Sequence, residues 1–400
     1  MPLKVLMFGW ELPPCNTGGL GTACFGLTQA LAEQNVDITF VLPQKANVKA
    51  DFMRLVFADI KGFNWPDFSP YDTLKYLPGN IPPEMVSDLL SAVNLYAKRA
   101  AEIARSYNYD IIHSHDWLCF PAGMVAKAVT DKPLITHVHA TEFDRSGGNG
   151  VNPLVYAIEK LGMERSDAVI AVSRFTKNLL EKHYIADSQK VNVVHNGVNL
   201  SEFTDSVDEE NPLNTLKSAG YKVVLFLGRL TLQKGPDYFL KAAKRALEYY
   251  PKAVFLIVGS GDMERQMIDL SIQLGISDKV LFAGFLRGQM LHQAFRSADL
   301  FVMPSVSEPF GITALEAVAN GTPAIISKQS GVSETMGHVL KADFWDIEEM
   351  ANQIVSVLNY PSLHNTLSEN GKKEVKKVSW KAAAAKTIDV YKKVLSQKKE

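Results

Sequence analysis

Short apolar segments, each followed by glycine or polar residues and then by a helical pattern, recur along the whole chain. Continuous apolar runs of this length are typical of strands buried on both faces of a parallel sheet. Strands that alternate with helices through short connections build α/β domains, so we predict an α/β fold with two parallel sheets. The segments lie at 4–8, 36–42, 109–117, 134–144, 167–173 and 191–198 in the first half, and at 221–229, 253–261, 280–285 and 299–304 in the second.

The chain of 400 residues exceeds the size of one typical hydrophobic core and suits two domains. The segment 201–220 is polar and acidic and interrupts the strand pattern, which restarts after it. We therefore predict a first domain at 1–200, a linker at 201–220 and a second domain at 221–379.

The charge balance excludes a general affinity for nucleic acid or for anionic membranes. The formal net charge is −1 and the sequence pI is about 6.8, so any anion must be bound by a local site. The lysine-rich run at 372–377 indicates a solvated helix face, and weak membrane association is the alternative. Neither the N-terminal apolar run nor any later one is long enough for a signal peptide or a membrane span.

The three cysteines, Cys15, Cys24 and Cys119, cannot all pair and share no metal-ligand spacing. We interpret them as reduced side chains, which favours a cytoplasmic location.

The stretch 307–323 is the most informative segment, because it follows an apolar strand and leads through a tight loop into a helix. Glu308 lies in the loop and Glu316 on the helix predicted at 311–320, which places two carboxylates at one strand end. The alternative is a purely structural role, in which Glu308 caps the helix and Glu316 is a solvated surface residue. The first N–H groups of such a helix favour an anion, and they belong to Phe310, Gly311, Ile312 and Thr313.

Two further strand ends favour phosphate binding. Gly18, Gly19 and Leu20 open a helix that runs to about residue 34, and a glycine-rich turn lets backbone N–H groups approach a phosphate closely. Arg229 and Lys234 place two cations on one loop, which suits a diphosphate better than either charge alone.

Two strand ends carry histidines two positions apart, and residues at that spacing share one face of a strand. The pairs are His113 with His115 and His137 with His139. Such pairs on neighbouring strands can hold zinc, but neutral imidazoles serve equally well as hydrogen-bonding groups.

The region 44–83 is the least periodic part of the chain and is rich in aromatic residues and prolines. A long irregular segment of this kind is either a packed insertion or a flap whose aromatic rings stack on sugars, and the residues do not decide between them.

These segments together resemble the retaining glycosyltransferases of GT-B architecture, of the family-4 and glycogen or starch synthase type. Glu308 and Glu316 match the E-x7-E signature of that family, and the glycine loop at 18–21, the H-x-H-D-W string ending at Trp117 and the Arg229–Lys234 loop match others. The resemblance implies two Rossmann-like domains that face each other across a cleft. It also implies that residues 380–400 form a helix that crosses back to the first domain, with the acceptor on the first domain and the nucleotide-sugar donor on the second.

The resemblance also implies roles for individual residues. Glu308, His139 and Asp116 would be catalytic, with Glu308 and His139 on the donor sugar. The donor diphosphate would be held by Gly18, Gly19, Leu20, Arg229 and Lys234. The ribose and sugar would contact Glu316, Phe310, Gly311, Ile312, Thr313 and Asn196, and the base would lie near Gly259 and Phe285.

One departure separates the chain from glycogen and starch synthases, which usually carry a lysine where this chain has Asn16. The neutral amide cannot supply that cation, so the chain is better likened to family-4 enzymes.

The predicted activity is transfer of a hexose, with glucose as the leading sugar, from UDP- or ADP-glucose to a glycan such as an α-glucan. No Asp-x-Asp pair is present, so we predict no metal requirement and no cofactor, the nucleotide sugar being a co-substrate. A sugar-nucleotide epimerase or phosphorylase and a non-catalytic nucleotide-sugar binding protein of the same plan remain alternatives.

Overall fold

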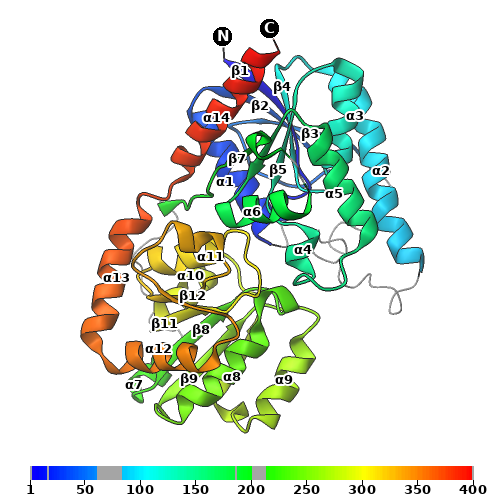
Figure 1. Ribbon diagram of the computed structural model, residues 1–400. Helices are drawn as coiled ribbons and strands as arrows, with labels where there is room; N and C mark the ends of the chain where they lie inside the picture. The colour runs from blue at the N-terminus through cyan, green and yellow to red at the C-terminus, as the bar shows by residue number, and fades with distance from the viewer. Residues whose placement is uncertain (1, 16–17, 61–82, 185–186, 201–212, 399–400) are drawn as a thin grey trace. The chain divides into compact units, whose positions relative to one another are not determined.

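The computed structural model describes residues 2–15, 18–60, 83–184, 187–200 and 213–398 (Figure 1). The chain divides into two compact units. Unit 1 comprises Met1–Gly197 and Trp380–Glu400, and unit 2 comprises Val198–Ser379. Each unit is built on one parallel sheet, which confirms the predicted α/β fold.

Unit 1 contains a seven-stranded parallel sheet in the order β3-β2-β1-β4-β5-β6-β7. The strands are β1 (Leu3–Phe8), β2 (Val36–Leu42), β3 (Arg54–Phe57), β4 (Ile111–His115), β5 (Leu134–Val138), β6 (Ala168–Ala171) and β7 (Val191–Val193). The helices are α1 (Gly19–Glu33), α2 (Pro83–Ser106), α3 (Phe120–Thr130), α4 (Glu142–Arg145), α5 (Pro153–Arg165), α6 (Arg174–His183) and α14 (Trp380–Gln397), with a 3-10 turn η3 (Ser188–Lys190).

Unit 2 contains a six-stranded parallel sheet in the order β10-β9-β8-β11-β12-β13. The strands are β8 (Lys222–Leu227), β9 (Ala253–Val258), β10 (Val280–Gly284), β11 (Leu300–Met303), β12 (Ala324–Ser327) and β13 (Leu340–Ala342). The helices are α7 (Leu213–Ser218), α8 (Pro236–Leu247), α9 (Glu264–Gln273), α10 (Gly288–Ser297), α11 (Ile312–Ala319), α12 (Ile347–Asn359) and α13 (Pro361–Val375). The described part of the unit also contains the 3-10 turns η5 (Leu232–Lys234), η6 (Ser277–Lys279) and η7 (Gly331–Glu334).

Both sheets reverse their winding direction at a corresponding point. The first strand of each unit lies between its second and fourth strands, so β1 neighbours β4 in unit 1 and β8 neighbours β11 in unit 2. In doubly wound sheets, ligands bind outside the carboxyl ends of the strands at such a point. The fold therefore directs attention to the loops after β1 and β4, and after β8 and β11.

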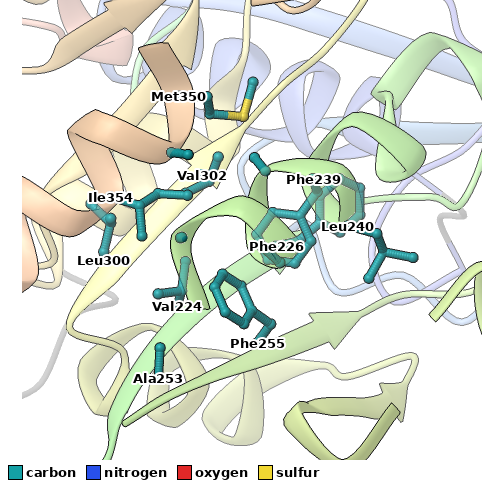
Figure 2. Close-up of a cluster of buried hydrophobic side chains, with 14 of the residues drawn as sticks. Val224, Phe226, Phe239, Leu240, Ala253, Phe255, Leu300, Val302, Met350 and Ile354 are labelled. Atoms are coloured by element: carbon teal, nitrogen blue, oxygen red, sulfur yellow. The ribbon is translucent and has the colours of Figure 1, made fainter. Parts of the chain in front are cut away.

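A buried apolar cluster holds the strands of unit 2 against α8 and α12 (Figure 2). Phe226 of β8, Phe239 of α8 and Phe255 of β9 pack ring against ring, with centroids 5.5 and 5.6 Å apart along that order. Burying a phenylalanine stabilises a fold by about 1.5–3 kcal/mol, so this cluster fixes where β8 ends and its loop begins.

The helix α14 belongs to unit 1, as the predicted helix crossing back to the first domain requires. Gln34 donates a hydrogen bond from Nε2 to the Lys381 carbonyl, 3.0 Å away. A Cβ added to Gly26 of α1 would lie 2.4 Å from atoms of the Trp380 ring, so glycine is required for this close approach. Tyr391 of the same helix is buried in the unit.

The sequence pattern did not indicate every element, since β12 and β13 follow the last strand that it predicted. Two further elements lie inside segments that we interpreted otherwise. The strand β3 lies inside the segment 44–83 that we interpreted as irregular, and α7 lies inside the predicted linker 201–220. Residues 61–82 and 201–212 lie outside the described residues, and most of the proposed aromatic flap falls there. Within the described ranges, no helix combines the length and apolar character needed to cross a bilayer.

Candidate functional site

Four histidines form two stacked pairs side by side at the carboxyl ends of β4 and β5, and we name His113, His115, His137 and His139 the histidine ladder. The parallel register pairs His115 with His137, which brings the two His-x-His segments onto one face. Ring centroids are 4.3 Å apart for His113 and His115, and 4.2 Å for His137 and His139, with interplanar angles of 24° and 21°.

One hydrogen bond ties the ladder to α14, and a second joins two of its members. His113 Nδ1 lies 2.6 Å from the Tyr391 hydroxyl of α14, and His115 Nδ1 lies 3.0 Å from His139 Nε2. Burial lowers the pKa of all four imidazoles, to about 3 for His113 and His139. The ladder is therefore neutral at pH 7, and each ring offers one donor and one acceptor nitrogen.

Two sets of side chains in this region approach metal-ligand spacing. One nitrogen each from His113, His115 and His137, and likewise atoms of Cys24, His115 and His139, lie within 4.8 Å of one another. Tetrahedral zinc with bonds of about 2.0–2.3 Å brings its ligand atoms to roughly 3.5 Å from one another. Face-to-face rings also direct their in-plane lone pairs side by side, whereas a single ion needs lone pairs that converge. The ladder geometry thus suits hydrogen bonding better than metal binding.

Asp116 supports the backbone of the turn that carries His139. Its Oδ1 accepts hydrogen bonds from the backbone N–H groups of His139, at 2.6 Å, and Ala140, at 3.4 Å. Burial raises the pKa of Asp116 to about 7. Asp116 itself adopts a left-handed φ of 59° at the end of β4. The sequence predicted a catalytic role for Asp116; the contacts described here are those of a side chain that positions His139.

A buried ionic network lies beside this turn and was not predicted from the sequence. Arg145 is 1% exposed and donates to Glu142 at 2.9 Å, to Glu159 and to the Ala140 carbonyl. Tyr184 donates to the other Glu159 oxygen at 2.5 Å, and burial raises the Glu159 pKa to about 7. The one sequence signal was the spacing of Thr141 and Asp144, which form a capping box at α4.

The predicted phosphate loop of unit 1 forms the start of α1. Gly18 is the extended N-cap residue, and Leu20 is buried. The buried carboxylate of Glu11 accepts a hydrogen bond from the Gly21 N–H at 3.1 Å. A Cβ added to Gly19 would meet no atom within 4 Å, so the packing of the unit does not require glycine at that position.

The loops after β8 and β11 lie at the switch point of unit 2, where the winding direction of its sheet reverses. They bring Lys234 and Glu308 into an ion pair, although 74 residues separate the two in sequence. Lys234 Nζ lies 2.7 Å from Glu308 Oε2, and the Ser305 hydroxyl donates to the same oxygen at 3.0 Å. The side chains of Lys234 and Glu308 are 23% and 8% exposed. The sequence predicted the two residues as separate donor contacts, and the structure places them together.

Backbone contacts fix the loop after β11 that carries Glu308. The Glu308 N–H donates to the Gln329 carbonyl, and the Glu308 carbonyl accepts from Gly331, both at 2.9 Å. Gln233 of η5 reaches the same loop, since its carbonyl accepts from Val306 and its amide donates to the Ser307 carbonyl. The loops after β8 and β11 are therefore one hydrogen-bonded structure.

Glycine conformations bring the backbone of this region close together. Gly259 has φ 134°, and a Cβ there would lie 2.0 Å from the Gly228 carbonyl oxygen, so the loops after β8 and β9 touch only because residue 259 is glycine. Gly259 also donates to the Gly284 carbonyl at 2.7 Å, next to Phe285, whose ring is 51% exposed.

The helix α11 follows Gly311, which has φ 107°, and contains Ile312, Thr313 and Glu316. Phe310 is buried beside its start. The first N–H groups of any helix lack acceptors within it, which favours an anion here. Asn196 is buried at the end of unit 1, where β7 has ended. The predicted site residues thus fall into a unit 1 set around His139 and a unit 2 set around Glu308.

The strand order of both units and the residues at their switch points define a class of enzyme, and comparisons with known proteins agree with it. Residues 17–202 match the family model described as Glycosyltransferase Family 4, and residues 207–374 match that of Glycosyl transferases group 1. An uncharacterized glycosyltransferase of Methanocaldococcus jannaschii is 33% identical over 98% of both chains. The chain belongs to the family-4-type GT-B glycosyltransferases.

More distant relatives and solved structures share its whole length. A glycogen synthase of Mycobacterium tuberculosis is 24% identical over 97% of this chain and 94% of its own. The sucrose-phosphate synthase of Thermosynechococcus elongatus superposes with a TM-score of 0.78 at 21% identity, covering 99% of this chain and 100% of that one. The HepE protein of Anabaena in complex with UDP-glucose superposes with a TM-score of 0.71 at 17% identity, covering 97% and 100%.

Proposed function

We propose that this glycosyltransferase moves glucose from UDP-glucose or ADP-glucose to a glycan acceptor of the α-glucan kind, with retention of anomeric configuration and without a bound metal. The observation that carries the proposal is the pair of Lys234 and Glu308 at the switch point of unit 2, bonded to each other at 2.7 Å. Transfer breaks the bond between a sugar and a diphosphate. A cation suits the diphosphate and a carboxylate suits the sugar hydroxyls, and here the two groups lie side by side.

The charges that develop during transfer explain why both groups are needed. When the bond between the anomeric carbon and the diphosphate oxygen breaks, the leaving group gains negative charge and the sugar ring gains positive charge, as in other glycosyl chemistry. Lys234 and Arg229 are assigned to the diphosphate, together with the N–H groups at the start of α1. Glu308 is assigned to the sugar hydroxyls and His139 to the donor sugar.

Retention is assigned to attack on the face that the diphosphate leaves. The departing phosphate oxygen takes the proton of the acceptor hydroxyl while the acceptor oxygen bonds to the anomeric carbon. This step needs no second carboxylate on the opposite face of the ring. It requires instead that cations stabilise the phosphate, which Arg229 and Lys234 supply without the Asp-x-Asp pair that holds a metal in other sugar transferases.

The relatives support this choice of donor and acceptor. Those named after a reaction include glycogen synthase and D-inositol 3-phosphate glycosyltransferase, the latter 27% identical in Salinispora arenicola over 94% of this chain and 87% of that one. HepE, a structural neighbour, was solved with UDP-glucose bound. An α-glucan and D-inositol 3-phosphate are therefore the two acceptors to compare first.

The test is release of nucleotide from UDP-glucose and from ADP-glucose in the presence of EDTA, with and without maltooligosaccharide. We expect release from one donor that the oligosaccharide stimulates, and a product whose new linkage is α by NMR. Stimulation by D-inositol 3-phosphate instead would keep the transferase and replace the acceptor. Loss of activity in EDTA that Mg²⁺ restores would refute metal independence, and a β linkage would refute retention.

A further inference from the structure

The histidine ladder carries more unsatisfied polar atoms than a core needs. Among the described residues, no hydrogen-bond partner lies near the buried Nε2 of His113 and His115, either ring nitrogen of His137, or Nδ1 of His139. Each such atom costs about 1–3 kcal/mol relative to a satisfied one. Apolar side chains of similar volume would pack this space without that cost, so the imidazoles serve something other than stability.

One contact within the ladder links it to the proposed donor site. The Nδ1 of His115 lies 3.0 Å from Nε2 of His139, and His139 is the histidine of the ladder that we assigned to the donor sugar. Because both rings are neutral, one of the two nitrogens must carry a proton and the other must not. The bond therefore couples the two tautomers, because Nε2 of His139 carries a proton only when Nδ1 of His115 does not.

We propose that His115 is a positioning residue that holds His139 in its Nε2–H tautomer, which leaves Nδ1 of His139 without a proton, as a hydrogen-bond acceptor. The inference rests on the proposed function for the role of His139, and on the 3.0 Å contact between the two rings for the role of His115. Neutral histidine intrinsically favours a proton on Nε2. With His139 donating from Nε2 and His115 accepting at Nδ1, both rings keep that favoured form.

The surroundings of His139 fix the remaining freedom of the ring. The ring of His137 stacks on it at 4.2 Å, and the carboxylate of Asp116 binds its backbone N–H at 2.6 Å. Stacking and the backbone bond hold the plane and the position of the residue but are indifferent to its tautomer. Selecting the tautomer is thus the specific contribution of His115, in the way that outer partners orient metal-bound histidines.

Substitutions at residue 115 separate this role from packing. The side-chain amide of asparagine lies near the place of Nδ1 and can turn its carbonyl oxygen towards His139 Nε2–H to accept, whereas the amide of glutamine reaches the place of Nε2. We expect His115→Asn to keep His139 in the Nε2–H form and to keep most of the turnover. We expect His115→Gln and His115→Ala to let part of the His139 population take the Nδ1–H form and to lower kcat measurably, with a smaller change in the donor KM.

The matched control is Tyr391→Phe, which removes the bond at the far end of the ladder, to His113. It leaves the contact between His115 and His139 in place, so the tautomer and kcat should stay as in the wild type.

The measurement is a long-range ¹H–¹⁵N spectrum of the full chain labelled in histidine, which distinguishes the two tautomers, with His139→Gln used to assign the signal. A wild-type Nδ1–H tautomer, or an unchanged tautomer and kcat in His115→Ala, would overturn the proposal. Equal losses of kcat in the asparagine and glutamine variants would also overturn the proposal. If the alanine variant does not fold, the comparison of these two variants is the test. Failure of the proposed function alone would appear as no transfer by the wild type, while the tautomer would still respond to residue 115.

Discussion

Units 1 and 2 share a strand order but carry opposite chemistry at corresponding strand ends. At β4 and β5 the side chains are neutral, buried imidazoles backed by a buried carboxylate and an arginine network. At β8 and β11 a lysine and a glutamate form an ion pair that is partly open to solvent. The shared topology thus decides where a site lies, and the residues on it decide what the site can bind.

This difference fits a division of labour in the proposed reaction. A diphosphate demands cations and backbone N–H groups, whereas a sugar demands neutral polar groups held in fixed orientation. Unit 2 has the partly exposed ion pair of Lys234 and Glu308, and unit 1 has neutral imidazoles held in a fixed orientation. The four predictions below test that division, beginning with the largest expected effect.

Glu308→Ala should lower kcat by roughly 10²–10³-fold, as removal of one preorganised transition-state contact does in other enzymes. Nucleotide release at saturating donor measures the effect. The matched control is Lys328→Ala, which breaks an exposed ion pair with Asp343 in the same unit and should leave kcat within twofold of the wild type. A Glu308→Ala enzyme with wild-type turnover would remove unit 2 from the chemistry.

Acid should destabilise the protein through unit 1. Unfolded histidine titrates near pH 6.5, and burial lowers the pKa of the four ladder imidazoles, so the unfolded state binds up to about four more protons as pH falls below 6.5. Asp116 and Glu159 act in the opposite sense, because their raised pKa of about 7 lets the folded state bind up to about two protons that the unfolded state releases above pH 4. The net of about two protons predicts that the free energy of unfolding falls by up to about 3 kcal/mol per pH unit below pH 6.

Calorimetric melting at pH 7.0 and 5.5 tests this sign. His137→Gln should reduce the pH dependence by about one proton, whereas Tyr391→Phe removes no group that titrates in this range and should not change it. A protein equally stable at both pH values would contradict the neutral ladder.

Lys234→Ala should raise the donor KM by roughly tenfold to 100-fold, since a hydrogen bond to a charged group contributes about 1.5–3 kcal/mol. The effect should shrink when binding is measured as the inhibition constant of an analogue in which an uncharged linker replaces the diphosphate of UDP-glucose. The cation then has no anion to bind. Equal losses with and without the diphosphate would assign Lys234 to the support of Glu308 alone.

Gly19→Ala should have the smallest effect on the fold, within about 0.5 kcal/mol, because a Cβ there meets nothing within 4 Å. Donor KM should nevertheless rise several-fold if the backbone of α1 approaches a phosphate. Gly26→Ala is the contrasting control, since its Cβ would lie 2.4 Å from the Trp380 ring and should lower stability. A silent Gly19→Ala would show that the glycine loop of unit 1 does not touch the donor.

The strands β1, β2 and β4 to β11 and the positions of Lys234 and Glu308 on strand ends were predictable, because continuous apolar runs mark buried parallel strands whatever their partners. The pairing of Lys234 with Glu308 was not, since it depends on β8 and β11 lying side by side across 74 residues. The strands β12 and β13 were not predicted. The strand β3 was missed because its four residues are only partly buried and lie among aromatic and proline residues. The network of Arg145 was missed for a different reason: charged residues are exposed by default, and only the register of β4 and β5 shows how deeply this turn is enclosed.

The placement of α14 has a consequence for how the protein is made. Residues 380–397 complete unit 1, although the ribosome synthesises all of unit 2 before them. Unit 2 is continuous in sequence and is ready to fold first, while the earlier-made unit still lacks the helix that supplies Trp380 and Tyr391. The nascent N-terminal half therefore lacks the contact of Tyr391 with His113 until residues 380–397 have been synthesised.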